Sequence, residues 1–422
     1  MTMAQSQPNI AELTDPFSLS KVVERATART RNVAAKVLRL VRPEIAKSTY
    51  LPPVFNVEIE PVAAPRKRAL LNYLVKPFHL GQESADRHSY SNESIARMMA
   101  RSLNRNGYVV DVVDWLDTTF QPACDYDLFI GMTPSFQRLA NLLKPDTIKI
   151  YWATRSHASF EKAALQARLD ALYKRRGLSL REDELFAGIR DDGVESADAI
   201  FVIGNQQTVS TYDHLGLPTY AVTNACLPIK KPELDAKDFA TARKNFLFLS
   251  SWGLVHKGLD QTLDAFSKMP DLHLWICAPL KDDRAFLRAY RTELFDRSNI
   301  HPIGWVDLHS EKFRHLVNRC AFQLFPSCAE GMAGSVLNGM SQGLIPLITR
   351  ESGIDLASNS YLDPCSPELI GKVATEVSNW PSEKVRNEAI LTIKEAETAH
   401  SFDAVLSQFE SALRAAIGMS QT

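Results

Sequence analysis

The chain has 422 residues, of which 45% are apolar and 23% are charged, with a formal net charge of −1. This length exceeds one ordinary hydrophobic core and predicts a soluble protein of two domains, and the balanced charge argues against nucleic acid as a partner. The six cysteines form no C-x-x-C pair, and neither a membrane-spanning apolar run nor a secretory signal is evident, so we expect a cytoplasmic protein without a zinc site or a disulfide framework.

Residues 1–65 are expected to hold a basic amphipathic helix followed by a proline-rich linker. Basic residues outnumber acidic ones in residues 20–47, where Val33, Val37 and Leu40 recur at helical spacing. Two interpretations remain open. The helix contacts anionic lipid peripherally at the inner face of a membrane, or it is a solvated helix that packs on the protein itself. The prolines in residues 51–66 separate this helix from the remainder of the chain.

Residues 66–228 alternate short apolar runs with helical patterns. This alternation predicts β-α-β units and a parallel sheet covered by helices on both faces. The expected strands are residues 69–78, 108–115, 127–132, 148–154, 198–204 and 219–224. Helices are expected at residues 92–106 and 158–176 among the connections.

The same alternation returns after a polar stretch at residues 228–239, which contains two prolines and predicts a connector at residues 229–244. Residues 245–380 are expected to form the second domain, with strands at 245–251, 272–279, 300–305, 321–327 and 345–351, each separated by one helix. Residues 381–422 are helical and are expected to pack back across both domains. The predicted fold class is α/β, with two Rossmann-like doubly wound parallel sheets facing across a cleft.

The most informative stretch is FPSCAEGMAGSVLNGMSQGLIPLITRESGID at residues 325–355. Ligands of open parallel sheets bind at the carboxyl ends of the strands, and a loop with Glu330, Gly331 and Gly334 comes directly after one of them here. Small residues let the backbone approach a ligand, and free N–H groups at the helix start near Ser335 favour a diphosphate. A helix N-cap with an acidic first turn is the alternative interpretation.

A second segment, FLFLSSWGLVHKGLDQTLDAF at residues 246–266, joins a strand to a helix through Lys257-Gly258. The ammonium group of Lys257 would lie against the same phosphates. With IHPIGWVD at residues 300–307, these segments resemble, in order and spacing, the C-terminal domain of family-4 GT-B glycosyltransferases (glycosyl transferases group 1). The resemblance is specific over residues 245–355 and architectural before them.

The resemblance implies a retaining glycosyltransferase that uses a UDP- or GDP-sugar without a metal ion or cofactor. It makes Lys257 a contact of the donor diphosphate and Glu330 a contact of the donor sugar, and it brings the nucleotide base to Trp305 and Val306. The implied donor site also includes Gly253, Gly331, Met332, Ala333, Gly334, Ser335 and Asn338.

Two positions depart from the family pattern. Asn338 replaces the glutamate that usually holds the ribose, although a neutral amide can still bind a diol. The family's arginine before the lysine is replaced within residues 250–253, so a second phosphate-binding cation is missing or comes from elsewhere, with Arg155 and Arg350 as options.

Polar residues after the strands of the first domain are candidates for the acceptor side. His157 is the first choice for a histidine near the transferred sugar, and His88 is the second; Arg155, Asn92 and Asn205 complete this set. A surface position explains a lone loop histidine equally well, and helix capping explains the residues near Asn205.

The expected reaction transfers a hexose-type sugar to an acceptor hydroxyl on a carbohydrate or glycolipid, in cell-surface polysaccharide or glycolipid biosynthesis. Its catalytic residues would be Lys257, Glu330 and His157. Two alternatives stay open: a nucleotide-sugar epimerase with the same two domains, and a degenerate module that binds a nucleotide-sugar or a partner without turnover. The departures at Asn338 and at residues 250–253 motivate the second alternative.

Overall fold

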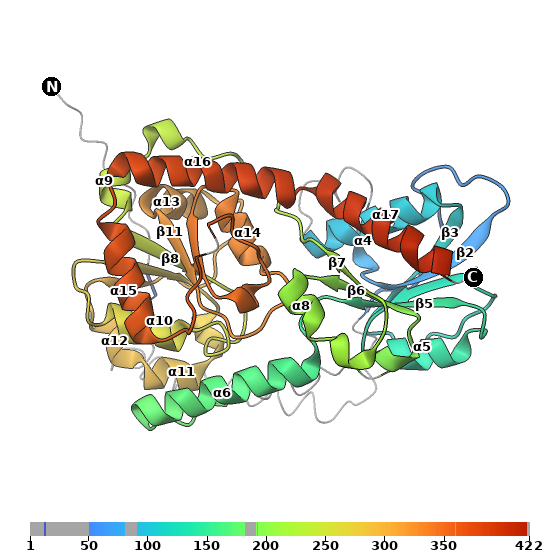
Figure 1. Ribbon diagram of the computed structural model, residues 1–422, viewed down its shortest axis with the longest axis horizontal. Helices are drawn as coiled ribbons and strands as arrows, with labels where there is room; N and C mark the ends of the chain where they lie inside the picture. Colours follow the sequence, from blue (N-terminus) through green and yellow to red (C-terminus); the bar gives the residue numbers. More distant parts are fainter. Residues whose placement is uncertain are drawn as a thin grey trace, which may run out of the picture.

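The computed structural model describes residues 12–13, 50–80, 91–181, 191, 193–358 and 360–419. Two β-sheets form the cores of two halves that lie side by side (Figure 1). The helix expected at residues 20–47 and the candidate His88 lie outside the described residues. Within those residues, no helix is both long enough and apolar enough to cross a membrane.

The first half is built on a seven-stranded sheet with the order β1-β3-β2-β4-β5-β6-β7. The six strands predicted from apolar runs are all present and parallel, because they alternate with helical connections and the inner strands are buried on both faces. The strands are β1 (Val54–Val57), β2 (Lys67–Tyr73), β3 (Tyr108–Asp114), β4 (Leu128–Gly131), β5 (Ile148–Ala153), β6 (Ala199–Ile203) and β7 (Thr219–Val222).

Strand β1 corrects the prediction for residues 51–66. The prolines predict only a linker there, but Val54–Val57 pairs antiparallel with β3 at the edge of the sheet. A second correction concerns residues 69–78, since β2 ends at Tyr73 and Lys76–His79 forms a short helix with Pro77 in its first turn. Proline lacks an N–H and is tolerated at a helix start, which accounts for the early end of the strand.

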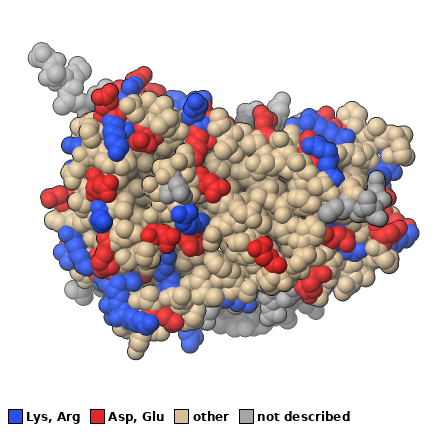
Figure 2. Space-filling model, in the orientation of Figure 1, with Lys and Arg blue, Asp and Glu red and all other residues tan. Residues whose placement is uncertain are grey.

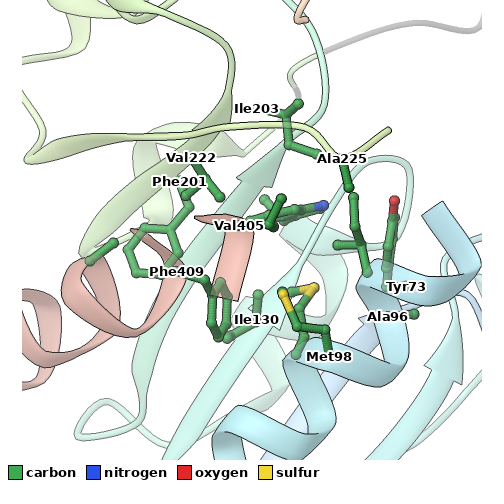
Figure 3. Packing of buried hydrophobic residues seen from close by; sticks show 14 of the residues in the cluster. Tyr73, Ala96, Met98, Ile130, Phe201, Ile203, Val222, Ala225, Val405 and Phe409 are labelled. Carbon is green, nitrogen blue, oxygen red and sulfur yellow. The ribbon is translucent and has the colours of Figure 1, made fainter. Parts of the chain in front are cut away.

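Helices cover both faces of the first sheet. The helices between its strands are α2 (Lys76–His79), α4 (Ser91–Arg105), α5 (Phe136–Leu142), α6 (Ala158–Arg176), which packs elsewhere, and α8 (Gln206–Ser210), with single turns at Val194–Ser196 and Asp213–Leu215. Helix α4 packs on one face together with α17 (Phe402–Met419) from the end of the chain, and α5 and α8 pack on the other. In Figure 3, Val405 and Phe409 of α17 lie among Ile130, Phe201 and Val222 of the sheet.

The second half contains a five-stranded parallel sheet with the order β10-β9-β8-β11-β12. Its strands are β8 (Asn245–Leu249), β9 (His273–Cys277), β10 (Ile300–Pro302), β11 (Phe322–Phe325) and β12 (Ile345–Ile348). Each lies within a predicted apolar run. The expectation of one helix per connection is wrong between β9 and β10, where two short helices follow a single turn.

The helices of the second half also lie on both faces of its sheet. They are α9 (Phe239–Ala242), α10 (Leu259–Phe266), α11 (Arg284–Ala289), α12 (Arg291–Phe295), α13 (Glu311–Arg319), α14 (Gly334–Met340), α15 (Pro367–Ser378) and α16 (Ser382–Ala399), with single turns at Leu234–Ala236, Leu280–Asp282 and Arg350–Ser352. Helix α16 packs on α14, and α17 returns to α4 and β7, so the chain crosses between the halves a second time.

Helix α6 also joins the halves, because it leaves the first sheet and runs beneath α10 and α12 of the second half (Figure 1). Arg175 donates to Asp260 at 2.6 Å and to Asp264 at 2.5 Å. Arg176 contacts Asp264 at 2.6 Å and Glu293 at 2.5 Å. Because Asp260 is completely buried, its charge depends on Arg175 for compensation, so these ion pairs tie the position of α6 to that of α10 and α12.

Charged side chains of both signs are interspersed over the second half on the face drawn in Figure 2. Uncharged residues cover most of the middle of this face. The described part of the face therefore presents no broad patch of one charge, in keeping with the net charge of −1.

Candidate functional site

A cleft of about 1440 Å³ lies between the two halves, lined by residues that follow strands of both sheets. This is where the rule for open parallel sheets places a ligand. The cleft brings together most residues predicted for the donor site. Those lining it are Lys257, Trp305, Val306, Glu330, Gly331, Met332, Ala333, Gly334, Ser335 and Asn338.

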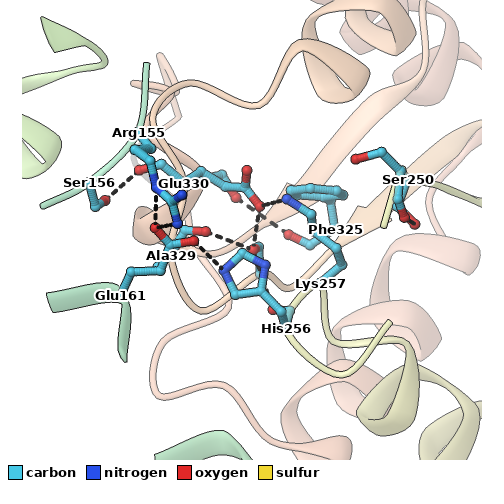
Figure 4. A network of polar contacts seen from close by, with 12 residues as sticks. Arg155, Ser156, Glu161, Ser250, His256, Lys257, Phe325, Ala329 and Glu330 are labelled. Atoms are coloured by element: carbon cyan, nitrogen blue, oxygen red, sulfur yellow. Dashed lines mark hydrogen bonds and ion pairs between the residues drawn. The ribbon is translucent and has the colours of Figure 1, made fainter. Parts of the chain in front are cut away.

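The side chains of Lys257 and Glu330 form an ion pair in this cleft (Figure 4). Glu330 also accepts a hydrogen bond of 2.6 Å from Ser327 Oγ, and the Lys257 ammonium lies 5.5 Å from the centre of the Phe325 ring. Both charged side chains are close to nine-tenths buried, so water screens their attraction weakly. When a ligand enters the cleft, the ammonium group can bind a phosphate in place of the carboxylate. The carboxylate can then accept hydrogen bonds from sugar hydroxyls in place of the ammonium group.

The loop before α10 brings Lys257 to this position. Gly253 O accepts from Lys257 N at 2.8 Å, and Gly258 has a φ of 81° that favours glycine. A Cβ at Gly258 would lie 2.4 Å from Pro326 O, so only glycine lets this loop meet the end of β11. Gly253 itself supports the loop and does not line the cleft.

Helix α14 begins at the floor of the cleft. The N–H of Ala333 donates to Ser352 O at 3.0 Å, and no side chain caps the helix. Within the described ranges, no protein group accepts a hydrogen bond from the N–H groups of Gly334 or Ser335. Such N–H groups attract anions, and Lys257 lines the same cleft.

A buried group of charges lies behind the ion pair and joins the halves (Figure 4). Arg155 of the first half donates to Glu161 at 2.6 Å, and Glu161 lies 3.7 Å from Nε2 of His256. Burial raises the pKa of Glu161 against the opposing effect of Arg155. Burial, followed by the charge of Lys257, holds the pKa of His256 well below its ordinary value. His256 is therefore neutral at pH 7, next to the charged Lys257.

Two exposed tryptophans and three further lysines line the cleft. Trp305 is 65% exposed and Trp252 is 55% exposed. The lysines are Lys76 after β2, Lys281 after β9 and Lys312 on α13. An exposed ring in a cleft can stack on a base or a sugar. Four carboxylates also line the cleft, those of Glu12, Asp282, Asp307 and Glu330, so the lining as a whole carries charges of both signs.

Most acceptor-side candidates do not line the cleft. The side chain of His157 caps α6 by accepting from Ser159 N, and its ring packs against Tyr212 and His214. Arg155 is bound to Glu161, and Asn205 caps α8 and donates to Asp355 at 2.8 Å. The structure therefore does not bring these three residues together with Lys257 and Glu330 at the cleft wall.

The remaining candidates take other positions. Asn92 is exposed near the start of α4. Arg350, an option for the second phosphate cation, contacts Asp363 at 3.5 Å and the Tyr361 ring, outside the cleft. Asn338 lines the cleft, but its side-chain oxygen accepts from Leu227 N at 2.8 Å and so holds the chain that leaves β7 for the second half.

Sequence reasoning missed several residues of the cleft. Lys76 and Thr154 line it from the first half, where the sequence directed attention to histidines. The apolar run at residues 69–78 predicted that Lys76 lies inside a strand. Pro77, directly after Lys76, is the signal from which the earlier end of the strand could have been predicted. The sequence around Lys281 indicates only a helix start.

No model of a known protein family matches this sequence, and no curated protein matches it. Solved structures do match. Sucrose-phosphate synthase from Thermosynechococcus elongatus aligns over 84% of this chain and 100% of its own, with a TM-score of 0.56 and 12% identity. HepE of Anabaena, in complex with UDP, aligns over 83% of this chain and 100% of its own, with a TM-score of 0.54 and 12% identity. The fold is GT-B.

A third structure, TarM, matches less of its own length. The alignment covers 68% of this chain and 54% of TarM, with a TM-score of 0.49 and 12% identity. The first two matches carry the assignment of the fold. Two Rossmann-like halves with parallel sheets and a cleft between them are the GT-B architecture that the sequence predicted.

Proposed function

We propose that the protein is a glycosyltransferase that transfers a sugar from a nucleoside diphosphate-sugar to an acceptor hydroxyl. The observation that carries this proposal is the Lys257–Glu330 pair in the cleft between the halves. The Lys257 ammonium suits the diphosphate and the Glu330 carboxylate suits the sugar hydroxyls. The two side chains lie next to each other, as the diphosphate and the sugar of such a donor do.

Backbone N–H groups and an exposed ring near the pair support the same donor. The N–H groups of Gly334 and Ser335 can bind phosphate oxygens, and the exposed ring of Trp305 can stack on the base. HepE, which shares the GT-B fold, has been crystallised with UDP and with UDP-glucose. UDP-glucose is therefore the first donor to test, and a GDP-sugar is the second.

In the proposed reaction, the bond between the anomeric carbon and the leaving phosphate oxygen breaks, and the acceptor oxygen bonds to that carbon. The acceptor proton goes to an oxygen of the departing diphosphate. Lys257 and the N–H groups at the start of α14 stabilise the charge that develops on the diphosphate, which is often the largest contribution to catalysis. Retention of the anomeric configuration fits this route, since no protein carboxylate has to act as the nucleophile.

The acceptor would bind on the wall of the cleft formed by Lys76 and Thr154 of the first half. We propose a carbohydrate or glycolipid acceptor, in cell-surface polysaccharide or glycolipid assembly. Peripheral contact of residues 20–47 with the inner face of a membrane would suit a glycolipid and stays a prediction from sequence.

Calorimetry with UDP-glucose, UDP and GDP tests this proposal. We expect wild-type protein to bind at least one of these ligands and Lys257→Ala to bind it about tenfold more weakly or worse, because a charge-assisted contact to phosphate is lost. Lys394→Ala removes an exposed lysine of α16 and serves as the control. Unchanged affinity in Lys257→Ala would mean that the phosphate assignment is wrong.

Incubation of the donor with and without acceptor sugars separates the alternatives. A transferase forms a new glycoside only when an acceptor is present. Rapid release of free sugar or of an isomer without acceptor would favour the epimerase instead. Tight binding of the donor without any turnover would favour the binding module.

A further inference from the structure

Three successive carbonyl groups of the loop after β11 accept hydrogen bonds from the first half. Glu330 O accepts from Ser156, at 2.5 Å from Oγ and 3.1 Å from N. Gly331 O accepts from Thr208 Oγ1 at 2.9 Å, and Met332 O accepts from Asn224 Nδ2 at 3.2 Å. The three donors are all buried.

The donors come from three separate strand ends of the first sheet. Ser156 follows β5, Thr208 lies on α8 after β6, and Asn224 follows β7. Adjacent parallel strands thus present their carboxyl ends to consecutive residues of one loop in the other half. Figure 4 shows the first of these contacts, between Ser156 and Glu330.

The loop lies so close to the first half that residue 331 has no room for a side chain. A Cβ at Gly331 would be 2.4 Å from Thr154 O and 2.7 Å from Ile203 O. The sequence suggested that glycine here lets the backbone approach a ligand, but in the structure it lets the backbone approach the first half. The loop therefore touches protein on one side and lines the cleft with its other side.

We propose that Ser156, Thr208 and Asn224 are positioning residues for the donor. They hold residues 330–332 in one shape, which presents the Glu330 carboxylate and the start of α14 to the cleft. Donor affinity thus depends on the docking of the first half against this loop. This inference rests on the proposed function, since it concerns the same site.

Thr208 offers the sharpest test because two variants separate its hydroxyl from its volume. Thr208→Val removes the hydroxyl and keeps the shape, and Thr208→Ser keeps the hydroxyl. Thr147→Val is the matched control, because Thr147 is equally buried in the same half and donates to Tyr126 O at 2.7 Å, away from the loop.

We expect Thr208→Val to weaken UDP-glucose binding by about three- to tenfold and to raise the donor KM by the same factor, as befits the loss of one buried hydrogen bond. Thr208→Ser should restore most of the affinity. Thr147→Val should lower thermal stability without changing the dissociation constant.

Amide hydrogen exchange in the ligand-free protein tests, without relying on the donor, whether the hydrogen bonds from the first half hold the loop at residues 330–332. Exchange in residues 330–336 should be faster in Thr208→Val and Ser156→Ala than in wild type and in Thr147→Val. If exchange there is unchanged while wild type binds UDP-glucose, the positioning role is wrong and the proposed function stands. If exchange rises as expected but no nucleotide-sugar binds, the hydrogen bonds do hold the loop, but the proposed function is wrong.

Discussion

At the scale of the single residue, the ion pair between Lys257 and Glu330 competes with donor binding, because each side chain must release the other before it can bind the donor. Glu330→Gln releases the Lys257 ammonium from its carboxylate partner and keeps a polar group near the sugar. We therefore expect UDP to bind at least as tightly to Glu330→Gln as to wild type. UDP-glucose should lose the added affinity that its sugar provides, and transfer should slow by about 10²-fold or more.

Calorimetry with UDP and UDP-glucose, alongside a transfer assay, checks this expectation. Glu383→Gln, on the exposed side of α16, is the control for loss of a carboxylate. Equal weakening of both ligands by Glu330→Gln would contradict a sugar-specific role for Glu330.

The residues of the cleft were predictable to different degrees. Lys257, Glu330 and Trp305 could be placed because each follows a strand whose carboxyl end faces the cleft. His157 also follows a strand, but it precedes the long helix α6 and turns its side chain back to cap it. The capping position could be predicted from the helical pattern, whereas the direction of the ring depends on Tyr212 and His214, which are distant in sequence.

At the scale of the element, α6 binds the second half through charged groups. Asp264 of α10 contacts both Arg175 and Arg176, so Asp264→Ala leaves two half-buried guanidinium groups with one acidic partner fewer. We expect the free energy of unfolding to fall by about 2 kcal/mol, because Arg175 keeps Asp260 and Arg176 keeps Glu293, but each loses one charge-assisted contact. Denaturant unfolding measures this change.

Asp170→Ala provides the comparison, since Asp170 lies on α6 itself at an exposed position and contacts only Gln166 among the side chains described around it. A loss of less than about 0.5 kcal/mol is expected there. Comparable losses for the two variants would show that the ion pairs between the halves contribute no more than an exposed contact.

The elements themselves could be predicted closely from the sequence. Eleven apolar runs each contain a strand, because the inner parallel strands are buried on both faces and so are mainly apolar, and the edge strands keep enough apolar residues to show the same pattern. Strand β1 was missed because its four residues, VFNV, have little pattern of their own. Its pairing depends on β3, which lies about fifty residues later in the chain.

At the scale of the whole molecule, the placement of the halves could not be read from the sequence. The residues that join them, such as Arg175, Ser156 and Asn224, look like ordinary polar surface residues when seen in sequence alone. Their partners lie more than eighty residues away, in the other half. The polar pattern marks such residues as exposed, and only the docked halves bury them.

The second crossing between the halves carries a buried histidine that should make the molecule sensitive to acid. His400 lies between α16 and α17, and its Nδ1 is 2.7 Å from Thr223 Oγ1 of the first half. Burial lowers the pKa of His400 from 6.5 to about 4, against opposing contributions from the Asn224 backbone and Asp355. Between these values the unfolded chain binds a proton that the folded protein does not, so stability is lost as the pH falls from 6.5 to 4.

His400→Gln keeps an acceptor for Thr223 and removes the titrating group. Because one pKa unit corresponds to about 1.4 kcal/mol, we expect the stability difference between wild type and this variant to shift by roughly 3 kcal/mol in favour of the variant between pH 7 and pH 4. Denaturant unfolding at several pH values in this range measures the shift, with His309→Gln at an exposed position as the control. A difference that stays constant with pH would mean that His400 binds its proton equally well in the folded and the unfolded protein, and the crossing would then not be the acid-sensitive joint of the two halves.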